Sequence, residues 1–236
     1  MNFARSGSGD LALVFLHYFG GSSRTWSKVI NKLNGEFRCI AVDLQGFGKS
    51  PSLGKGLSVS DSAQSVADLI TTLQLKRYVL IGHSMGGKIT LSLASRRPFG
   101  LESLVLIAPS PPTPEPMDAK ERAQLMAAYN NRSALTKIIN SITSKPLSDI
   151  EINNLVNDNV RASEIGWKSW IEYGSQEDIS LEVSNINVPV LVISGQCDKK
   201  LSSSFLYNEF GDYFPTVHFE EIRRQDIYYL LKLHYL

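Results

Sequence analysis

The sequence has few cysteines, almost no net charge and no long apolar run. Two cysteines among 236 residues, Cys39 and Cys197, are too few for a disulfide framework or a cysteine-rich metal cluster, and this favours a reducing compartment. A formal net charge of +1 gives no electrostatic reason to bind nucleic acid or an anionic membrane. We therefore expect a small-molecule substrate as the partner, with neither nucleic acid nor membrane involved.

Membrane insertion and secretion signals are also missing from the sequence. No segment approaches the roughly 20 consecutive apolar residues that cross a bilayer. Residues 1–5, MNFAR, do not lead into the apolar core of a signal peptide. These observations predict a cytoplasmic protein.

Short apolar runs alternate with helical patterns along most of the chain. Each run is continuous rather than alternating, which is typical of a strand that is covered on both faces. Repeated strand–helix units of this kind predict an α/β fold, with a mainly parallel sheet and helices on both of its faces. The predicted strands are residues 11–16, 37–42, 78–81, 104–107, 188–194 and 216–222.

Residues 113–178 interrupt this alternation. They show several helical patterns, over residues 119–129, 135–142, 149–157 and 165–173, and no convincing strand. The insert follows a strand's carboxyl end, where open α/β sheets bind their ligands, so we predict a helical lid (cap). With residues 113–178 as the lid, residues 1–112 and 179–236 would form the core domain. The alternative to a lid is a helical layer that only packs over the sheet edge.

The strongest local motif is GHSMGG at residues 82–87. It follows an apolar run and precedes a helical pattern, the context that distinguishes a nucleophile elbow from a common Gly-rich turn. Side chains at Gly82 or Gly86 would collide across so tight a turn. The motif predicts an exposed Ser84 hydroxyl beside the free amides of a helix N-terminus. In the alternative interpretation Ser84 only caps that helix.

Four stretches together resemble the α/β-hydrolase superfamily, in its group of small serine esterases and haloperoxidase-like hydrolases. The resemblance extends over about residues 11–222 and implies the α/β-hydrolase fold. It is specific for the fold, less specific for hydrolysis, and says little about the substrate. The stretches are residues 17–21 (HYFGG) with Trp26, 43–50 (DLQGFGKS), 82–87 (GHSMGG) and 195–198 (GQCD).

The resemblance implies a role for each matching residue. Ser84 matches the nucleophile, and the backbone N–H groups of Met85 and Phe19 match the oxyanion donors, although Tyr18 stands where many relatives have glycine. Asp198 matches the acid that orients a catalytic histidine, because the acid follows the nucleophile in this fold. The implied reaction is hydrolysis of a carboxylic ester through an acyl-enzyme, without a metal or organic cofactor. A non-catalytic small-molecule binding protein is the alternative.

The catalytic histidine is missing from its expected place. The family carries it after the last strand as Gly-His, followed by apolar residues and Glu-x-Pro, whereas this chain has Gln225-Asp226 there. His218 lies within the predicted strand and His234 lies past the loop, so both are weak candidates for the base. Without that base a serine hydroxyl is a poor nucleophile. We expect His83 and Asp43 to support loops, and His17 either to do the same or to point toward the site.

The genetic code offers an explanation for the missing histidine. Residues 225–234 can be encoded so that a shifted frame reads Gly-His-Leu-Leu-Pro-Leu-Glu-Ala-Pro, which is the family's loop. We hypothesise that one nucleotide was lost near the codon for Arg223, so that residues 223–236 are an out-of-frame tail. A genuinely divergent C-terminus is the alternative. Loss of the final helix would expose part of one sheet face, with reduced stability or association as a homodimer.

Overall fold

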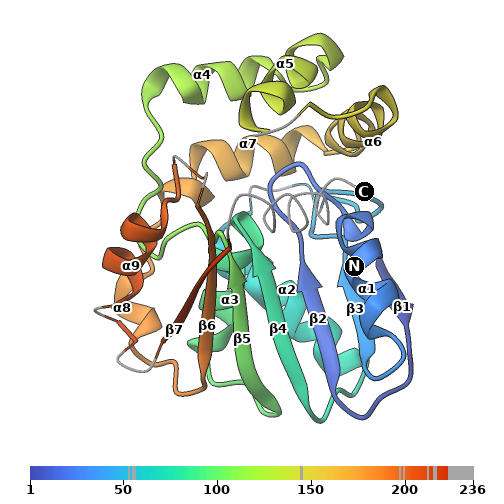
Figure 1. Cartoon of the computed structure of the whole chain (residues 1–236), viewed down its shortest axis with the longest axis vertical. Helices are drawn as coiled ribbons and strands as arrows, with labels where there is room; N and C mark the ends of the chain where they lie inside the picture. Colours follow the sequence, from blue (N-terminus) through green and yellow to red (C-terminus); the bar gives the residue numbers. More distant parts are fainter. Residues whose placement is uncertain are drawn as a thin grey trace.

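A single twisted sheet of seven strands forms the centre of the computed structural model (Figure 1). The strand order is β1-β3-β2-β4-β5-β6-β7, and every neighbouring pair is parallel except β1 with β3. The strands are β1 Phe3–Ser6, β2 Ala12–Leu16, β3 Arg38–Val42, β4 Tyr78–His83, β5 Leu101–Ile107, β6 Val190–Gly195 and β7 His218–Ile222. The structure describes residues 1–52, 54, 57–143, 146–196, 198, 200–211, 213–214 and 217–222.

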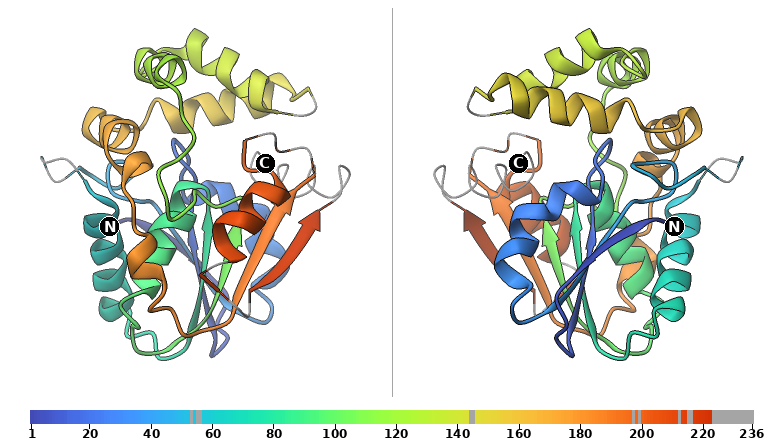
Figure 2. Two further views of the ribbon diagram at one scale, coloured as in Figure 1. Left: turned by 90° about the vertical axis from the view of Figure 1, so that its left-hand side faces the viewer. Right: turned by 90° about the vertical axis from the view of Figure 1, so that its right-hand side faces the viewer.

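Helices cover both faces of this sheet, as predicted. In the two side views, α1 (Ser27–Leu33) and α2 (Val59–Thr72) lie on opposite sides of the sheet (Figure 2). Also on the core are α3 (Met85–Ala94), α8 (Ser180–Val183) and α9 (Ser203–Gly211). The larger apolar cluster includes residues of β2, α2, α3 and α9, and the smaller one lies beneath α1. The prediction of a mainly parallel α/β sheet is confirmed.

Strand β2 shows why the central strands read as continuous apolar runs. Val14 belongs to the larger cluster, while Phe15 belongs to the smaller one. In the smaller cluster, the ring centroids of Phe15 and Trp26 lie 5.1 Å apart. Because successive side chains point to opposite faces, a strand that is covered on both sides needs an apolar residue at every position.

Four helices of the insert lie above the carboxyl ends of the strands (Figures 1 and 2). They are α4 Ala119–Ala127, α5 Arg132–Ile142, α6 Asp149–Asn159 and α7 Glu164–Glu172, close to the predicted ranges. Each begins after a capping side chain that accepts a hydrogen bond from the third helical residue, as Ser148 does from Glu151 N–H. Within the described residues of 113–178 there is no strand. None of the helices seen in the described chain is long and apolar enough to cross a bilayer.

Candidate active site

Ser84 occupies a strained turn between β4 and α3. Its φ of 49° and ψ of −117° lie outside the regions that a non-glycine residue ordinarily adopts, and such strain persists only where neighbours hold it. The Ser84 N–H donates to the carbonyl oxygen of Ile107 at 3.1 Å, and the Ser84 carbonyl accepts from Gly87 and Ser110. The Ser84 side chain makes no capping hydrogen bond to α3. The hydroxyl is therefore not committed to capping.

The glycine at the start of the motif allows β4 and α3 to approach closely. A Cβ added at Gly82 would lie 2.5 Å from the carbonyl oxygen of Gly86 and 2.5 Å from the hydroxyl oxygen of Thr90. Both distances are far below van der Waals contact. The turn that presents Ser84 thus requires glycine for close packing, as the sequence predicted.

A cavity of about 390 Å³ opens beside Ser84, between the sheet and the insert. Ser84, Phe19 and Asp198 all line it, together with His83. They come from three places at the carboxyl ends of the strands: Phe19 follows β2, His83 and Ser84 stand at the end of β4, and Asp198 follows β6. Helices α4 to α7 of the insert supply other parts of the wall. The structure therefore brings the predicted nucleophile, the predicted acid and one predicted oxyanion residue to a single cavity.

Asp198 lies in the turn that follows β6. Its Oδ1 accepts hydrogen bonds from the N–H groups of Lys200 and Leu201, at 3.0 and 2.8 Å. These contacts fix the carboxylate in its turn, and Asp198 also lines the cavity beside Ser84. Its role in orienting a histidine stays a prediction.

The two predicted oxyanion residues come from different segments, the start of α3 and the loop after β2. Met85 is the first residue of α3, and the first amides of a helix have no acceptor within that helix. Phe19 follows β2, and its ring lies 4.4 Å, centroid to centroid, from that of Trp167 in α7. The insert thus packs directly on the loop that would hold the second donor.

His17 has a structural role. It is fully buried, its Nδ1 lies 2.7 Å from the carbonyl oxygen of Tyr18, and its Nε2 accepts from the N–H of Leu44 at 3.0 Å. Burial lowers the pKa of His17 to about 4, against opposing effects of the Tyr18 carbonyl and Asp43. Both ring nitrogens are engaged, so the loop-supporting alternative is correct and the alternative of pointing toward the site is wrong.

The other histidines do not supply an evident base. His83 lines the cavity and packs edge-on against Tyr18, with ring centroids 5.3 Å apart. His218 is in β7, its side chain is 71% exposed and pairs with Glu220, and it is not among the cavity's lining residues. His234 lies outside the described residues, as does the whole predicted out-of-frame tail, residues 223–236.

The comparison with known protein families agrees with this geometry. The sequence pattern described as the alpha/beta hydrolase fold matches residues 12–151, more than half of the chain. The chain belongs to the α/β-hydrolase fold family.

Individual relatives show how far the similarity extends. A putative 2-succinyl-6-hydroxy-2,4-cyclohexadiene-1-carboxylate synthase of Bacillus subtilis is 29% identical over 205 residues, 80% of this chain and 74% of that protein. The 2-(acetamidomethylene)succinate hydrolase of Mesorhizobium japonicum is 27% identical over 223 residues, 87% and 77% of the two chains. Uncharacterised proteins of Mycobacterium tuberculosis are 35% identical over 106 residues, so that this α/β hydrolase covers only 31% of their length.

Solved structures agree on the fold. An esterase from Exiguobacterium antarcticum superposes with a TM-score of 0.85 at 22% identity, covering 98% of this chain and 93% of the esterase. At that identity the likeness establishes the α/β-hydrolase fold and leaves the substrate open.

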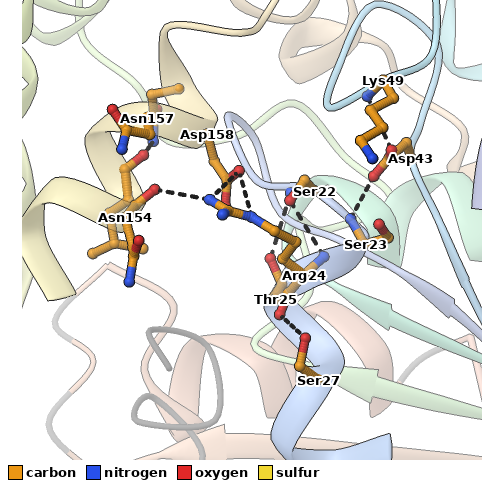
Figure 3. A network of polar contacts seen from close by, with 12 residues as sticks. Ser22, Ser23, Arg24, Thr25, Ser27, Asp43, Lys49, Asn154, Asn157 and Asp158 are labelled. Carbon is orange, nitrogen blue, oxygen red and sulfur yellow. Dashed lines mark hydrogen bonds and ion pairs between the residues drawn. The ribbon is translucent and has the colours of Figure 1, made fainter. Parts of the chain in front are cut away.

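Asp43 holds the loop that follows β3. Its Oδ1 accepts from Ser23 N–H at 2.6 Å, and its Oδ2 accepts from the Lys49 N–H and the Asn2 side chain (Figure 3). Burial acts to raise the pKa of Asp43, but these hydrogen bonds outweigh it and the pKa lies below its ordinary value. The prediction that Asp43 fixes its loop is confirmed.

An ion pair next to this loop connects the α/β-hydrolase core with the insert. The guanidinium of Arg24 donates from Nε and Nη2 to Asp158 Oδ1, at 3.1 and 2.7 Å, and from Nη2 to the carbonyl oxygen of Asn154 (Figure 3). Burial raises the pKa of Asp158, and Arg24 opposes that rise. This side of the insert is thus anchored through a charge that the core supplies.

Lys88 anchors the two ends of the insert to the nucleophile's helix. Its side chain is fully buried, and its Nζ donates to the carbonyl oxygens of Thr113, at 3.0 Å, and of Glu177. Thr113 precedes α4 and Glu177 follows α7, so one ammonium group contacts both connections of the insert. Burial lowers the pKa of Lys88 to about 8, opposed by the nearby carboxylates of Glu115, Glu177, Asp178 and Glu209.

We expect Lys88 to make the stability of this hydrolase pH-dependent. Between pH 8 and the ordinary value of 10.5, the folded chain holds fewer protons at Lys88 than the unfolded chain, so the free energy of unfolding rises with pH. The rise is up to about 3 kcal/mol. Lys88→Met should abolish it, as measured by urea denaturation across this pH range. Lys200→Met, which removes a partly exposed lysine at the insert, is the control and should keep the rise. A pH-independent difference between wild type and Lys88→Met would contradict the prediction.

Several charged residues of the cavity carry no recognisable motif. Glu115, Glu121 and Lys200 line it, yet none was predicted from the sequence. The only available signals were positional, since Glu115 begins the insert and Lys200 follows Asp198 by two residues.

Proposed function

We propose that this chain is a serine hydrolase of small carboxylic esters, acting through an acyl-enzyme on Ser84. The observation that carries the proposal is the strained turn, with φ of 49° at Ser84, at the wall of a cavity that Asp198 also lines. A hydroxyl held in this way, beside the first amides of a helix, is suited to attack on a carbonyl carbon.

The mechanism is acyl transfer. Ser84 Oγ attacks the ester carbonyl, and the N–H groups of Met85 and Phe19 stabilise the oxyanion. A histidine, oriented by Asp198, takes the serine proton and returns it to the leaving alcohol. Water then releases the acid by the same route. In this chain the histidine step is impaired, because the loop that carries it in the family is replaced by residues 223–236.

Names of relatives support hydrolysis as the reaction class. The Mesorhizobium relative is a hydrolase of an acetamidomethylene succinate, and the Exiguobacterium structure is an esterase. Both names describe hydrolysis. They differ in the compound cleaved, so the proposal extends to the reaction class and not to either substrate.

A second function, non-catalytic binding of a small molecule on the same fold, is favoured by one observation. Among the described residues, His83 is the one histidine that lines the cavity. It directly precedes the nucleophile in the chain, so it is not the histidine that the family carries after the last strand. A cavity without a base could retain its ligand unchanged.

Labelling by a fluorophosphonate probe distinguishes these functions. In the chain with the shifted-frame Gly-His loop restored, we expect rapid covalent labelling that disappears in Ser84→Ala, because the probe reacts with an activated serine. The present chain should label slowly, because the base is missing from its expected place. The control is Ser95→Ala, at the other end of α3, which should label as the wild type does. Mass spectrometry of the labelled peptide gives the modified residue. Ligand binding without any labelling of Ser84 would favour the binding protein.

A further inference from the structure

The cavity beside Ser84 has an apolar part and a charged part. The insert supplies the apolar part, which includes Leu125, Leu135, Ile138, Ile139, Leu155 and Trp167. The charged part lies where the insert meets the core, and it includes Glu115, Glu121, Asp198 and Lys200. A volume of about 390 Å³ is in the range of small-molecule sites. A ligand that fills it must have an apolar portion and must also satisfy the charged groups.

The charges in this lining do not balance. Among the described residues of the lining, three carboxyl groups stand against one ammonium group, and that ammonium is already paired, because Lys200 Nζ lies 2.6 Å from Glu121 Oε1. Asp198 accepts two backbone hydrogen bonds and is the predicted partner of the catalytic histidine. The remaining carboxyl group is that of Glu115.

Glu115 lacks a committed cation of its own. Lys88 is near enough to influence it, but the Lys88 ammonium donates to the carbonyl oxygens of Thr113 and Glu177. Burial raises the pKa of Glu115, and the Ser110 hydroxyl together with the charges of Lys200 and Lys88 only partly opposes this. A half-buried carboxylate that has lost part of its water gains most from a positively charged ligand atom, which replaces the missing hydration.

We propose that the substrate of this site carries an ammonium group beside its apolar chain, and that Glu115 selects it. The proposal rests on the proposed function, whose substrate class it names. Anionic compounds are disfavoured, because the carboxyl groups of Glu115 and Asp198 would repel them and the described lining offers no unpaired cation to attract them. The aromatic rings of Phe19, Trp167 and Trp170 in the same wall add an attraction that cations share and anions do not.

Three probes of one length test the proposal on the chain as it exists. Hexylammonium, 1-hexanol and hexanoate share their alkyl chain and differ in charge. We expect hexylammonium to bind about tenfold more tightly than hexanol, and hexanoate to bind most weakly. In Glu115→Gln, which keeps the shape of the side chain, hexylammonium should lose this advantage while hexanol binds as before. Isothermal titration calorimetry measures all six affinities.

The control variant is Glu102→Gln, which makes the same charge change at an ion pair with Arg77 on the surface. It should leave the order of the probes unchanged. A second readout separates recognition from structure. At mildly acidic pH, hexylammonium should displace a proton from Glu115, so that the binding heat depends on the buffer's ionisation enthalpy in wild type and not in Glu115→Gln.

Two outcomes would overturn the proposal: no probe binds, or hexylammonium shows no advantage that Glu115→Gln removes. Fluorophosphonate labelling, read separately, reports on the hydrolase. An ammonium preference without labelling of the loop-restored chain would overturn the hydrolase and support Glu115 as a selecting residue. Labelling without an ammonium preference would support the hydrolase and overturn Glu115 as a selecting residue.

Discussion

Gly86→Ala is expected to destabilise the protein by about 3 kcal/mol or more. A Cβ at this position would lie 2.4 Å from the carbonyl oxygen of Leu16 and 2.7 Å from that of His17. Both atoms belong to the backbone at the end of β2, so no side chain can rotate away to make room. Relief requires α3 to move away from β2, and α3 is the helix that begins at the Ser84 turn.

The displacement should affect the nucleophile as well as stability. We expect Gly86→Ala to unfold at lower urea concentration and to lose fluorophosphonate labelling at temperatures where it is still folded. The matched control is Gly35→Ala, where the added Cβ would meet no atom within 4 Å. Its free energy of unfolding should change by less than about 0.5 kcal/mol. Equal stability of the two variants would show that the loop after β2 yields more easily than its backbone contacts indicate.

Local periodicity explains why most of the fold could be predicted. The apolar runs that became β2, β3 and β4 are buried on both faces, and β5 and β6 alternate buried with half-buried residues. Such patterns can be read without knowledge of the neighbouring strands. The edge strand β1, Phe3–Ser6, was not predicted. It has four residues, two of them exposed, and it exists because it pairs antiparallel with β3. This pairing depends on a distant segment of the chain, so the residues of β1 alone do not predict the strand. The start of α2, in contrast, is set locally, since its cap Ser58 exchanges hydrogen bonds with Asp61.

The same distinction, between local patterns and contacts of distant segments, separates the site residues that could be predicted from those that could not. Ser84 was found because its chemistry requires a turn whose glycines lie within a few residues. Asp198 was found from its place after a strand. Glu115, Lys88 and Lys200 could not be found in this way, because their significance arises from contacts between the core and the insert. The buried Lys88 contacts both ends of the insert, at Thr113 and Glu177, and no short motif encodes that arrangement.

Restoring the shifted frame is expected to raise the turnover of a short p-nitrophenyl ester by about 10³-fold or more, because the members of a catalytic triad act as a unit. The restored chain would continue after Ile222 with Pro-Lys-Ala-Gly-His-Leu-Leu-Pro-Leu-Glu-Ala-Pro in place of residues 223–236. The residual rate of the present chain would come from the oxyanion hole and binding alone. Steady-state kinetics on both proteins, prepared identically, measures the difference.

A gain in rate could also come from a better-ordered loop, so the restored chain needs its own control. Replacing the histidine of the new loop with alanine keeps the loop and removes the base. If the base is what the present chain lacks, this variant should return to its low rate while keeping any gain in thermal stability. Ser84→Ala in the restored chain should be equally slow, since removing either member disables the pair. A restored chain no faster than the present one would indicate a divergent C-terminus, and the non-catalytic alternative would then account better for a cavity with Ser84 and Asp198 in its wall.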